Sequence, residues 1–72
     1  MIIQLEKNGK IYQAYKEISI CRTCIIDVYE LISYNNCKNH RFIMSKGTKL
    51  DFNNTTENDL IKLSKELIET IL

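Results

Sequence analysis

The chain has 72 residues, of which 44% are hydrophobic, and it contains no proline and two glycines. This length allows a single domain over residues 1–72, and the composition excludes collagen-like, disordered and linker sequences. Ten basic and nine acidic residues give a formal charge of +1, which excludes a protein that coats nucleic acid by charge alone. No apolar run exceeds three residues, so we expect neither a membrane span nor a signal peptide, and a cytoplasmic location.

The first predicted element is a β-hairpin whose turn is Asn8-Gly9, because both residues accept the positive φ angles of a type I′ turn. This turn pairs residues 3–7 with residues 10–14. The register places four apolar side chains on one face, which then needs a cover: Ile3, Leu5, Tyr12 and Ala14.

The central segments carry weaker signals. Residues 25–34 fit helical spacing as well as the β-branched and aromatic content of a strand, and we favour strand or irregular structure. Residues 41–45 form another apolar stretch, which Lys46-Gly47 should end in a turn or a helix cap. A last short strand is expected around Leu50 and Phe52, which alternate with polar residues.

The C-terminal segment predicts an amphipathic helix of about four turns. Thr56, followed three residues later by Asp59, is a variant of the capping box at its start. Four residues at three- and four-residue steps should face the core: Leu60, Leu63, Leu67 and Ile71. Three more are displaced around the helix and are the expected contact face for a partner protein or a second copy in a homodimer: Ile61, Ile68 and Leu72.

All three cysteines and the single histidine fall into two pairs with the same spacing, in the pattern C-x2-C-x12-C-x2-H. Zinc prefers four such ligands in a tetrahedron, and a two-residue spacer lets both side chains of a pair reach one ion. The pattern therefore predicts one structural Zn2+, held by Cys21, Cys24, Cys37 and His40. With every coordination position filled by the protein, this zinc would not be catalytic.

Other interpretations of the cysteines stay open. A free Cys is often only a small buried apolar residue. A redox role for the Cys21-Cys24 pair lacks a βαβ context, and the odd number of cysteines disfavours a disulfide framework. The size of the chain favours the metal, because a core this small seldom supplies more than ~3 to 5 kcal/mol, whereas structural zinc supplies ~10 to 16 kcal/mol in finger peptides.

The ligand pattern resembles the zinc-ribbon and treble-clef groups of small zinc domains, over residues 21–40 only. Together with the predicted hairpin and helix, this resemblance gives the expected α+β fold: an N-terminal β-hairpin, a CxxC/CxxH zinc-ribbon-like centre and a C-terminal amphipathic helix. A ribbon is slightly preferred to a treble clef, in which Cys37 and His40 would begin a helix. The hairpin that leads from Gly9 through Tyr12 into a CxxC pair also resembles small cysteine-rich proteins encoded by phages and prophages.

For function, we expect a non-enzymatic zinc-binding interaction module that contacts a cellular protein, or a host protein if the chain is an inhibitor or adaptor encoded by a phage. The alternative is a nucleic-acid-binding zinc ribbon, since residues 21–50 have a net charge of +3 while residues 51–72 have −3. Its phosphate contacts would be Lys38, Arg41, Lys46 and Lys49. An enzyme is disfavoured, because the sequence has no glycine-rich phosphate loop and no carboxylate pair near a histidine.

Overall fold

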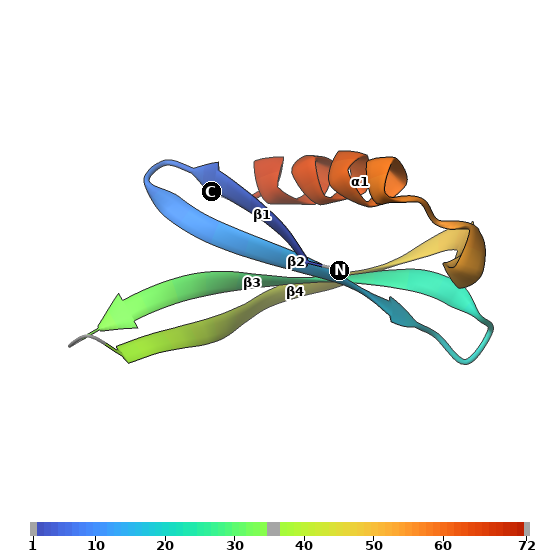
Figure 1. Cartoon of the computed structure of the whole chain (residues 1–72), viewed down its shortest axis with the longest axis horizontal. Helices are drawn as coiled ribbons and strands as arrows, with labels where there is room; N and C mark the ends of the chain where they lie inside the picture. Colours follow the sequence, from blue (N-terminus) through green and yellow to red (C-terminus); the bar gives the residue numbers. More distant parts are fainter. Residues whose placement is uncertain (1, 35–36, 72) are drawn as a thin grey trace.

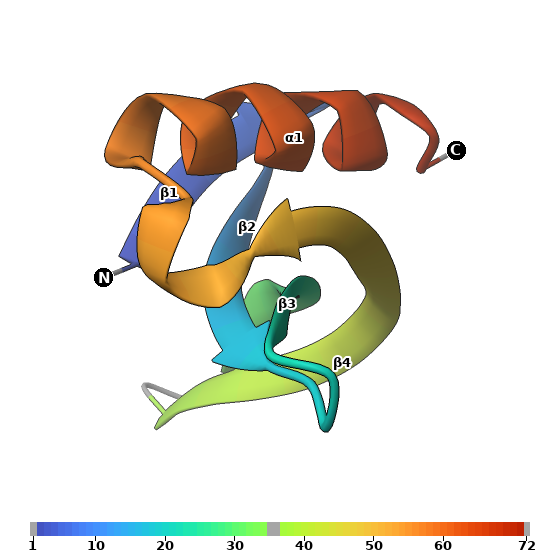
Figure 2. The same cartoon turned by 90° about the vertical axis from the view of Figure 1, so that its right-hand side faces the viewer.

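The computed structural model describes residues 2–34 and 37–71. In these residues four antiparallel strands follow one another in chain order and form one sheet: β1 (Ile2–Lys7), β2 (Lys10–Ile18), β3 (Thr23–Tyr34) and β4 (Cys37–Asp51). A 3-10 turn, η1 (Phe52–Asn54), leads into the helix α1 (Glu57–Glu69), which lies across one face of the twisted sheet (Figure 1, Figure 2). The fold is α+β, as the sequence predicts, but it is a four-stranded meander and not a zinc ribbon.

The β1–β2 hairpin has the turn and the register that the sequence predicts. Asn8 and Gly9 have φ angles of 52° and 78°, the left-handed conformation that a type I′ turn requires. Leu5 pairs with Tyr12, and Ile3 pairs with Ala14. Three of these four side chains are buried beneath α1 and Leu5 packs against them, so the apolar face of the hairpin has the cover it needs.

The ambiguous segment at residues 25–34 is part of β3, and residues 41–45 and Leu50 belong to the fifteen-residue strand β4. Phe52, expected in a separate short strand, begins the 3-10 turn η1. The turn or helix cap predicted at Lys46-Gly47 is wrong, because β4 continues to Asp51 and Gly47 pairs with Ile25 within the β3–β4 ladder. A register shift near Val28 and Tyr29 marks a bulge, which changes the direction of β4 without ending it.

The predicted zinc site at Cys21, Cys24, Cys37 and His40 is wrong, and so is the assignment of the chain to the zinc fingers or zinc ribbons. Cys24 is the second residue of β3 and is fully buried in the core, whereas Cys37 pairs with Tyr34 at the far end of that strand. Ten residues of strand separate the two positions by roughly 30 Å, in a molecule whose longest dimension is 40 Å. Across residues 2–34 and 37–71, no group of three or more His, Cys, Asp or Glu side chains could hold a metal ion.

The helix begins as predicted. The Thr56 hydroxyl accepts a hydrogen bond from the Asp59 amide, and the Asp59 carboxylate accepts one from the Thr56 amide, which completes a capping box. The helix packs on β1, β2 and β3. The buried apolar core lies between sheet and helix: Ile3, Tyr12, Ala14, Cys24, Ile26, Val28, Leu60, Leu67 and Ile68.

The apolar residues of α1 are not divided into a buried face and an outer contact face in the way that the sequence predicts. Leu60 is fully buried, but Leu63 is half-buried, and Ile68, expected on the outer contact face, is only 3% exposed and belongs to the core. Ile61 is half-buried against the same core, and Leu72 lies outside the described residues. In the part of the chain that the structure describes, no helix is both long enough and apolar enough to cross a membrane.

Candidate functional site

The face of the sheet opposite α1 carries the candidate site. Side chains alternate along each strand, so the residues next to the buried Ala14, Ile26 and Val28 point away from the helix. An apolar and aromatic group then runs over all four strands: Ile2 on β1, Tyr15 on β2, Tyr29 on β3 and Phe42 on β4. Ile2 pairs with Tyr15, and Tyr29 pairs with Phe42, whereas Tyr15 and Tyr29 are diagonal neighbours because Tyr15 itself pairs with Asp27. We call these four residues the open-face row.

The aromatic rings of the open-face row contact one another edge to face. The Tyr29 ring lies 5.5 Å from the Tyr15 ring at 88°, and 5.5 Å from the Phe42 ring at 70°, measured between centroids. The His40 ring is a third neighbour of Tyr29, at 6.5 Å between centroids. These T-shaped contacts are favourable for aromatic quadrupoles and hold the rings in fixed positions. Phe42 nevertheless remains 56% exposed, and Ile2 54% exposed.

Gln13 holds the polar edge of this group. Its Nε2 donates to Gln4 Oε1 at 3.2 Å, while its Oε1 accepts from the Tyr15 hydroxyl at 3.3 Å. The same oxygen lies 2.8 Å from His40 Nε2, so the imidazole that was expected to bind zinc is hydrogen-bonded to a side-chain amide. The open-face row is therefore bordered by a hydrogen-bonded network that spans β1, β2 and β4.

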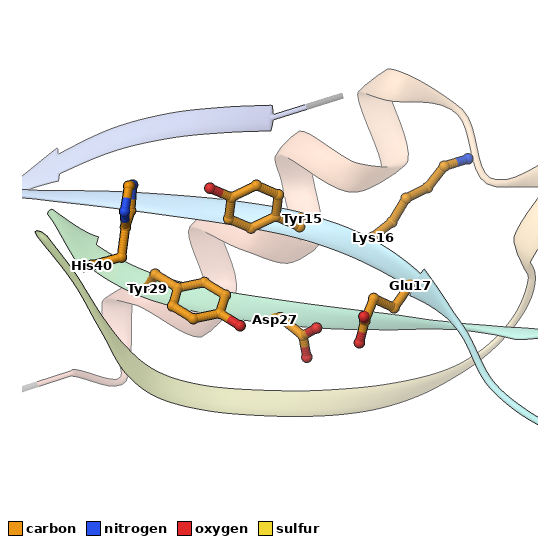
Figure 3. A pocket seen from close by; sticks show the side chains of 6 residues that line it. All are labelled: Tyr15, Lys16, Glu17, Asp27, Tyr29 and His40. Carbon is orange, nitrogen blue, oxygen red and sulfur yellow. The ribbon is translucent and has the colours of Figure 1, made fainter.

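An open depression with a volume of about 370 Å³ lies beside the Tyr15 and Tyr29 rings. Its lining comes from β2, β3 and β4: Tyr15, Lys16, Glu17, Asp27, Tyr29 and His40 (Figure 3). Asp27 is only 8% exposed, and its Oδ1 accepts a 2.5 Å hydrogen bond from the Ser45 hydroxyl. Asp27 raises the pKa of Glu17 through a side-chain hydrogen bond and through its negative charge, with a further contribution from desolvation.

The cations near this depression are engaged elsewhere. The Lys16 ammonium donates to the carbonyl oxygens of Phe52 and Thr55 at 3.2 and 3.3 Å and lies 4.4 Å from the centroid of the Phe52 ring. It points away from the two carboxylates (Figure 3). Within the described residues, the ion pairs of 4 Å or less both involve Glu30, on the helix side of the sheet.

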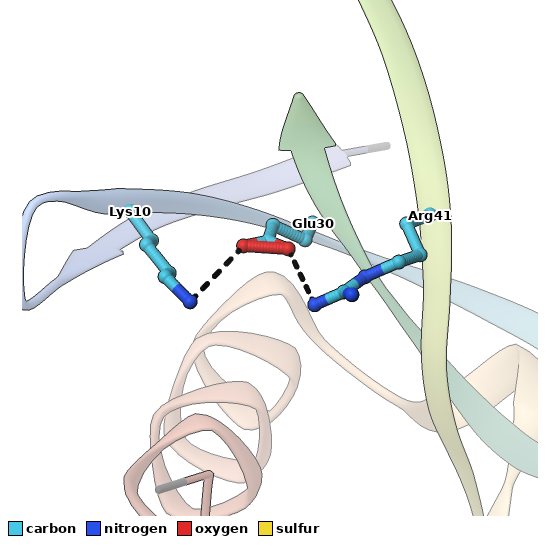
Figure 4. Close-up of polar contacts among 3 residues, drawn as sticks. All are labelled: Lys10, Glu30 and Arg41. Atoms are coloured by element: carbon cyan, nitrogen blue, oxygen red, sulfur yellow. Dashed lines mark hydrogen bonds and ion pairs between the residues drawn. The ribbon is translucent and has the colours of Figure 1, made fainter. Parts of the chain in front are cut away.

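The predicted nucleic-acid contacts are spread along β4. Arg41 donates to Glu30 at 2.8 Å, with Lys10 on the other carboxylate oxygen at 3.7 Å (Figure 4). Lys46 lines a small groove next to Glu66 of α1. Lys38 lies near the β3–β4 turn and Lys49 near the end of the strand, both exposed. The structure does not bring the four cations together on one face.

The sequence interpretation missed the open-face row. Its signal was the period-two alternation of Gln13, Tyr15 and Glu17 and of Asp27, Tyr29 and Leu31. That alternation shows which residues share a face only once residues 25–34 are known to be a strand beside β2. The competing helical spacing concealed it.

Comparisons with known proteins identify no relative of this chain. No protein-family model, no curated protein and no solved structure matches the chain. The function must therefore be argued from the geometry of the open face.

Proposed function

We propose that the chain is a small non-enzymatic interaction module that binds another protein through the open face of its sheet. The observation that carries the proposal is the open-face row, in which four neighbouring strands present apolar and aromatic side chains on the side that α1 does not cover. Exposed apolar groups that lie side by side mark contact surfaces more often than scattered ones do. Aromatic residues held by their neighbours are also the usual anchors of protein interfaces.

The charges on this face favour a basic protein partner. Glu17 and Asp27 lie beside the aromatic rings, and Glu6 lies on β1 of the same face. A phosphate backbone would meet these carboxylates, which disfavours nucleic acid here. Two copies docked face to face would bring the carboxylates of both together, which disfavours a homodimer through this surface. A protein segment with lysine or arginine complements the face.

No observation favours the nucleic-acid alternative over this one. Arg41 is held by Glu30, so one of the four predicted phosphate contacts is already paired with a carboxylate. Lys46 lines the same small groove as Glu66.

The test replaces Phe42 with photo-crosslinking benzoylphenylalanine, which suits an exposed aromatic position, and places the same group at Lys62 on the exposed side of α1 as the control. Irradiation in cells should give a discrete adduct with one other protein from position 42 and not from position 62. Adding Ile2→Glu, which alters the far end of the open-face row at an exposed position, should remove the adduct.

Three results would contradict the proposal: equal crosslinking from both positions, an adduct with a second copy of the chain, or an adduct with nucleic acid. Circular dichroism of each variant should match the unmodified protein, so that loss of the adduct reports contact and not unfolding.

A further inference from the structure

The depression beside Tyr15 and Tyr29 holds a buried carboxylate that forms no ion pair with any cation in residues 2–34 and 37–71. Asp27 is more than nine-tenths buried, and the Ser45 hydroxyl is its hydrogen-bond donor. Burying a carboxylate costs free energy unless hydrogen bonds or a counter-charge compensate it. The nearest lysine along the strand, Lys16, has its ammonium on the carbonyl groups of Phe52 and Thr55.

A second carboxylate faces the first. Glu17 on β2 and Asp27 on β3 lie side by side at the end of the depression, while the rings of Tyr15 and Tyr29 form its wall (Figure 3). Two acceptors next to aromatic rings match one particular side chain. A guanidinium group is planar, presents several N–H donors to carboxylates, and stacks on aromatic rings, whereas an ammonium group is more strongly hydrated.

We propose that this depression receives a single arginine side chain of the partner protein, with its guanidinium on Glu17 and Asp27 and its methylene groups along Tyr15 and Tyr29. The inference rests on the proposed function, because the arginine belongs to the protein that docks on the open face. It adds the chemistry of the contact: the open-face row supplies apolar area, and the carboxylate pair selects a cation.

The site should bind its cation in a pH-dependent manner. Asp27 raises the pKa of Glu17, so the pair retains a proton to higher pH than an isolated glutamate would. A guanidinium between the two groups favours the doubly ionised pair, and its binding releases that proton. The other titratable groups that line the depression are His40 from β4, Tyr29 from β3, and Tyr15 and Lys16 from β2. The Lys16 ammonium points away from the two carboxylates (Figure 3). Binding should therefore weaken as the pH falls through the raised pKa of Glu17.

The experiment titrates the isotopically labelled protein with N-acetyl-arginine amide and follows backbone and side-chain carboxyl resonances by NMR. N-acetyl-citrulline amide is the matched probe, because it has nearly the same shape without the charge. Arginine amide should shift the resonances of Glu17, Asp27 and Tyr29 in a saturable way, and citrulline amide should not. Lysine amide should bind more weakly than arginine amide.

The matched variants are Glu17→Gln and Glu69→Gln, which remove one exposed carboxylate each, in the depression and on α1. Glu17→Gln should weaken arginine amide binding about fivefold, in line with an exposed ion pair, and Glu69→Gln should leave it unchanged. Equal binding of citrulline amide, or equal effects of the two variants, would overturn the inference. If arginine amide does not bind while position 42 still crosslinks a partner, the arginine pocket fails and the proposed function stands.

Discussion

The Lys7 ammonium lies 2.9 Å from the carbonyl oxygen of Glu69, at the C-terminal end of α1. It also donates to the carbonyl oxygens of Ile68 and Ile71. The last carbonyl groups of a helix have no partner within the helix and carry the negative end of its dipole. Lys7 therefore caps the C-terminal end of α1, whose last turn contains no basic residue of its own, and it links β1 to that end of the helix.

Lys7→Met should lower the free energy of unfolding by about 1 to 2 kcal/mol, because it removes a cation and its hydrogen bonds from the helix terminus and keeps the methylene packing. Lys62→Met removes the same charge from the exposed side of α1 and is the control. Urea unfolding followed by circular dichroism measures both. A loss of similar size in the two variants would attribute the effect to net charge and not to the helix end.

Substitution of Ser64 should increase the stability of the protein, unlike substitution of Lys7. Its side chain is fully buried on α1, and its hydroxyl is the one buried side-chain polar atom without a hydrogen-bond partner in residues 2–34 and 37–71. Ser64→Ala should raise the free energy of unfolding by about 1 kcal/mol, since it removes an uncompensated polar group and improves helix propensity. Ser45→Ala is the contrast, because it takes the donor from buried Asp27 and should destabilise. Thermal unfolding of the two variants should move the midpoint in opposite directions.

The elements that could be predicted from sequence are those whose signals are local. Asn8-Gly9 determines its own turn and, through the alternation of side chains, the register of β1 on β2. Thr56 and Asp59 form the start of the helix from residues three positions apart. In each case, the physical cause lies within a few residues of its effect.

The features that could not be predicted depend on which strands are neighbours. Gly47 would suit a turn, but its pairing with Ile25 keeps it inside a strand. The matched cysteine spacings indicate zinc only if the two pairs meet in space. The length of β3 instead separates Cys24, near its start, from Cys37, which begins β4 and pairs with Tyr34 at the other end of β3. The candidate site has the same origin, because Glu17 and Asp27 meet only through the β2–β3 pairing.

Because the cysteines do not converge, the fold should be independent of metal. Strong chelators should leave the unfolding midpoint unchanged, and Cys37→Ser should be close to neutral because Cys37 is exposed. Cys24→Ser should cost about 1 to 3 kcal/mol, since it places a hydroxyl in the fully buried core. The opposite result would be unfolding on chelation together with equal losses of unfolding free energy in Cys37→Ser and Cys24→Ser. It would support a metal site and contradict this prediction.

Because both cations contact the carboxylate of Glu30, the two can be compared. Removing Arg41 should lower the free energy of unfolding more than removing Lys10. Its side chain is 9% exposed, and the Arg41 contact is 2.8 Å, against 3.7 Å for Lys10. Arg41→Ala should therefore cost about 1 to 2 kcal/mol, and Lys10→Ala less than about 0.5 kcal/mol. Adding Glu30→Gln to Arg41→Ala should recover part of the loss, because the neutral amide is cheaper to bury. Urea unfolding of the three variants checks the order, and equal effects of Arg41→Ala and Lys10→Ala would contradict it.

The raised pKa of Glu17 determines the sign of a pH effect on stability. Asp27 holds a proton on Glu17 in the folded chain at pH values where the unfolded chain has released it, so the folded state binds more protons in that interval. Stability is then lost as the pH rises from the ordinary glutamate pKa through the raised one. Below the ordinary value both states are protonated, and the effect disappears.

Glu17→Gln cannot ionise and should avoid this loss. The variant should match the parent protein at pH values below the ordinary glutamate pKa, and become more stable than the parent as the pH rises through the raised pKa. The measurement is urea unfolding of both proteins across this interval, with Glu57→Gln as a control that removes a carboxylate far from Asp27, at the start of α1. Because Glu57 lies at the positive end of the helix dipole, its loss should destabilise at neutral pH, the opposite sign. A constant difference between Glu17→Gln and the parent at every pH would mean that Glu17 and Asp27 do not share a proton.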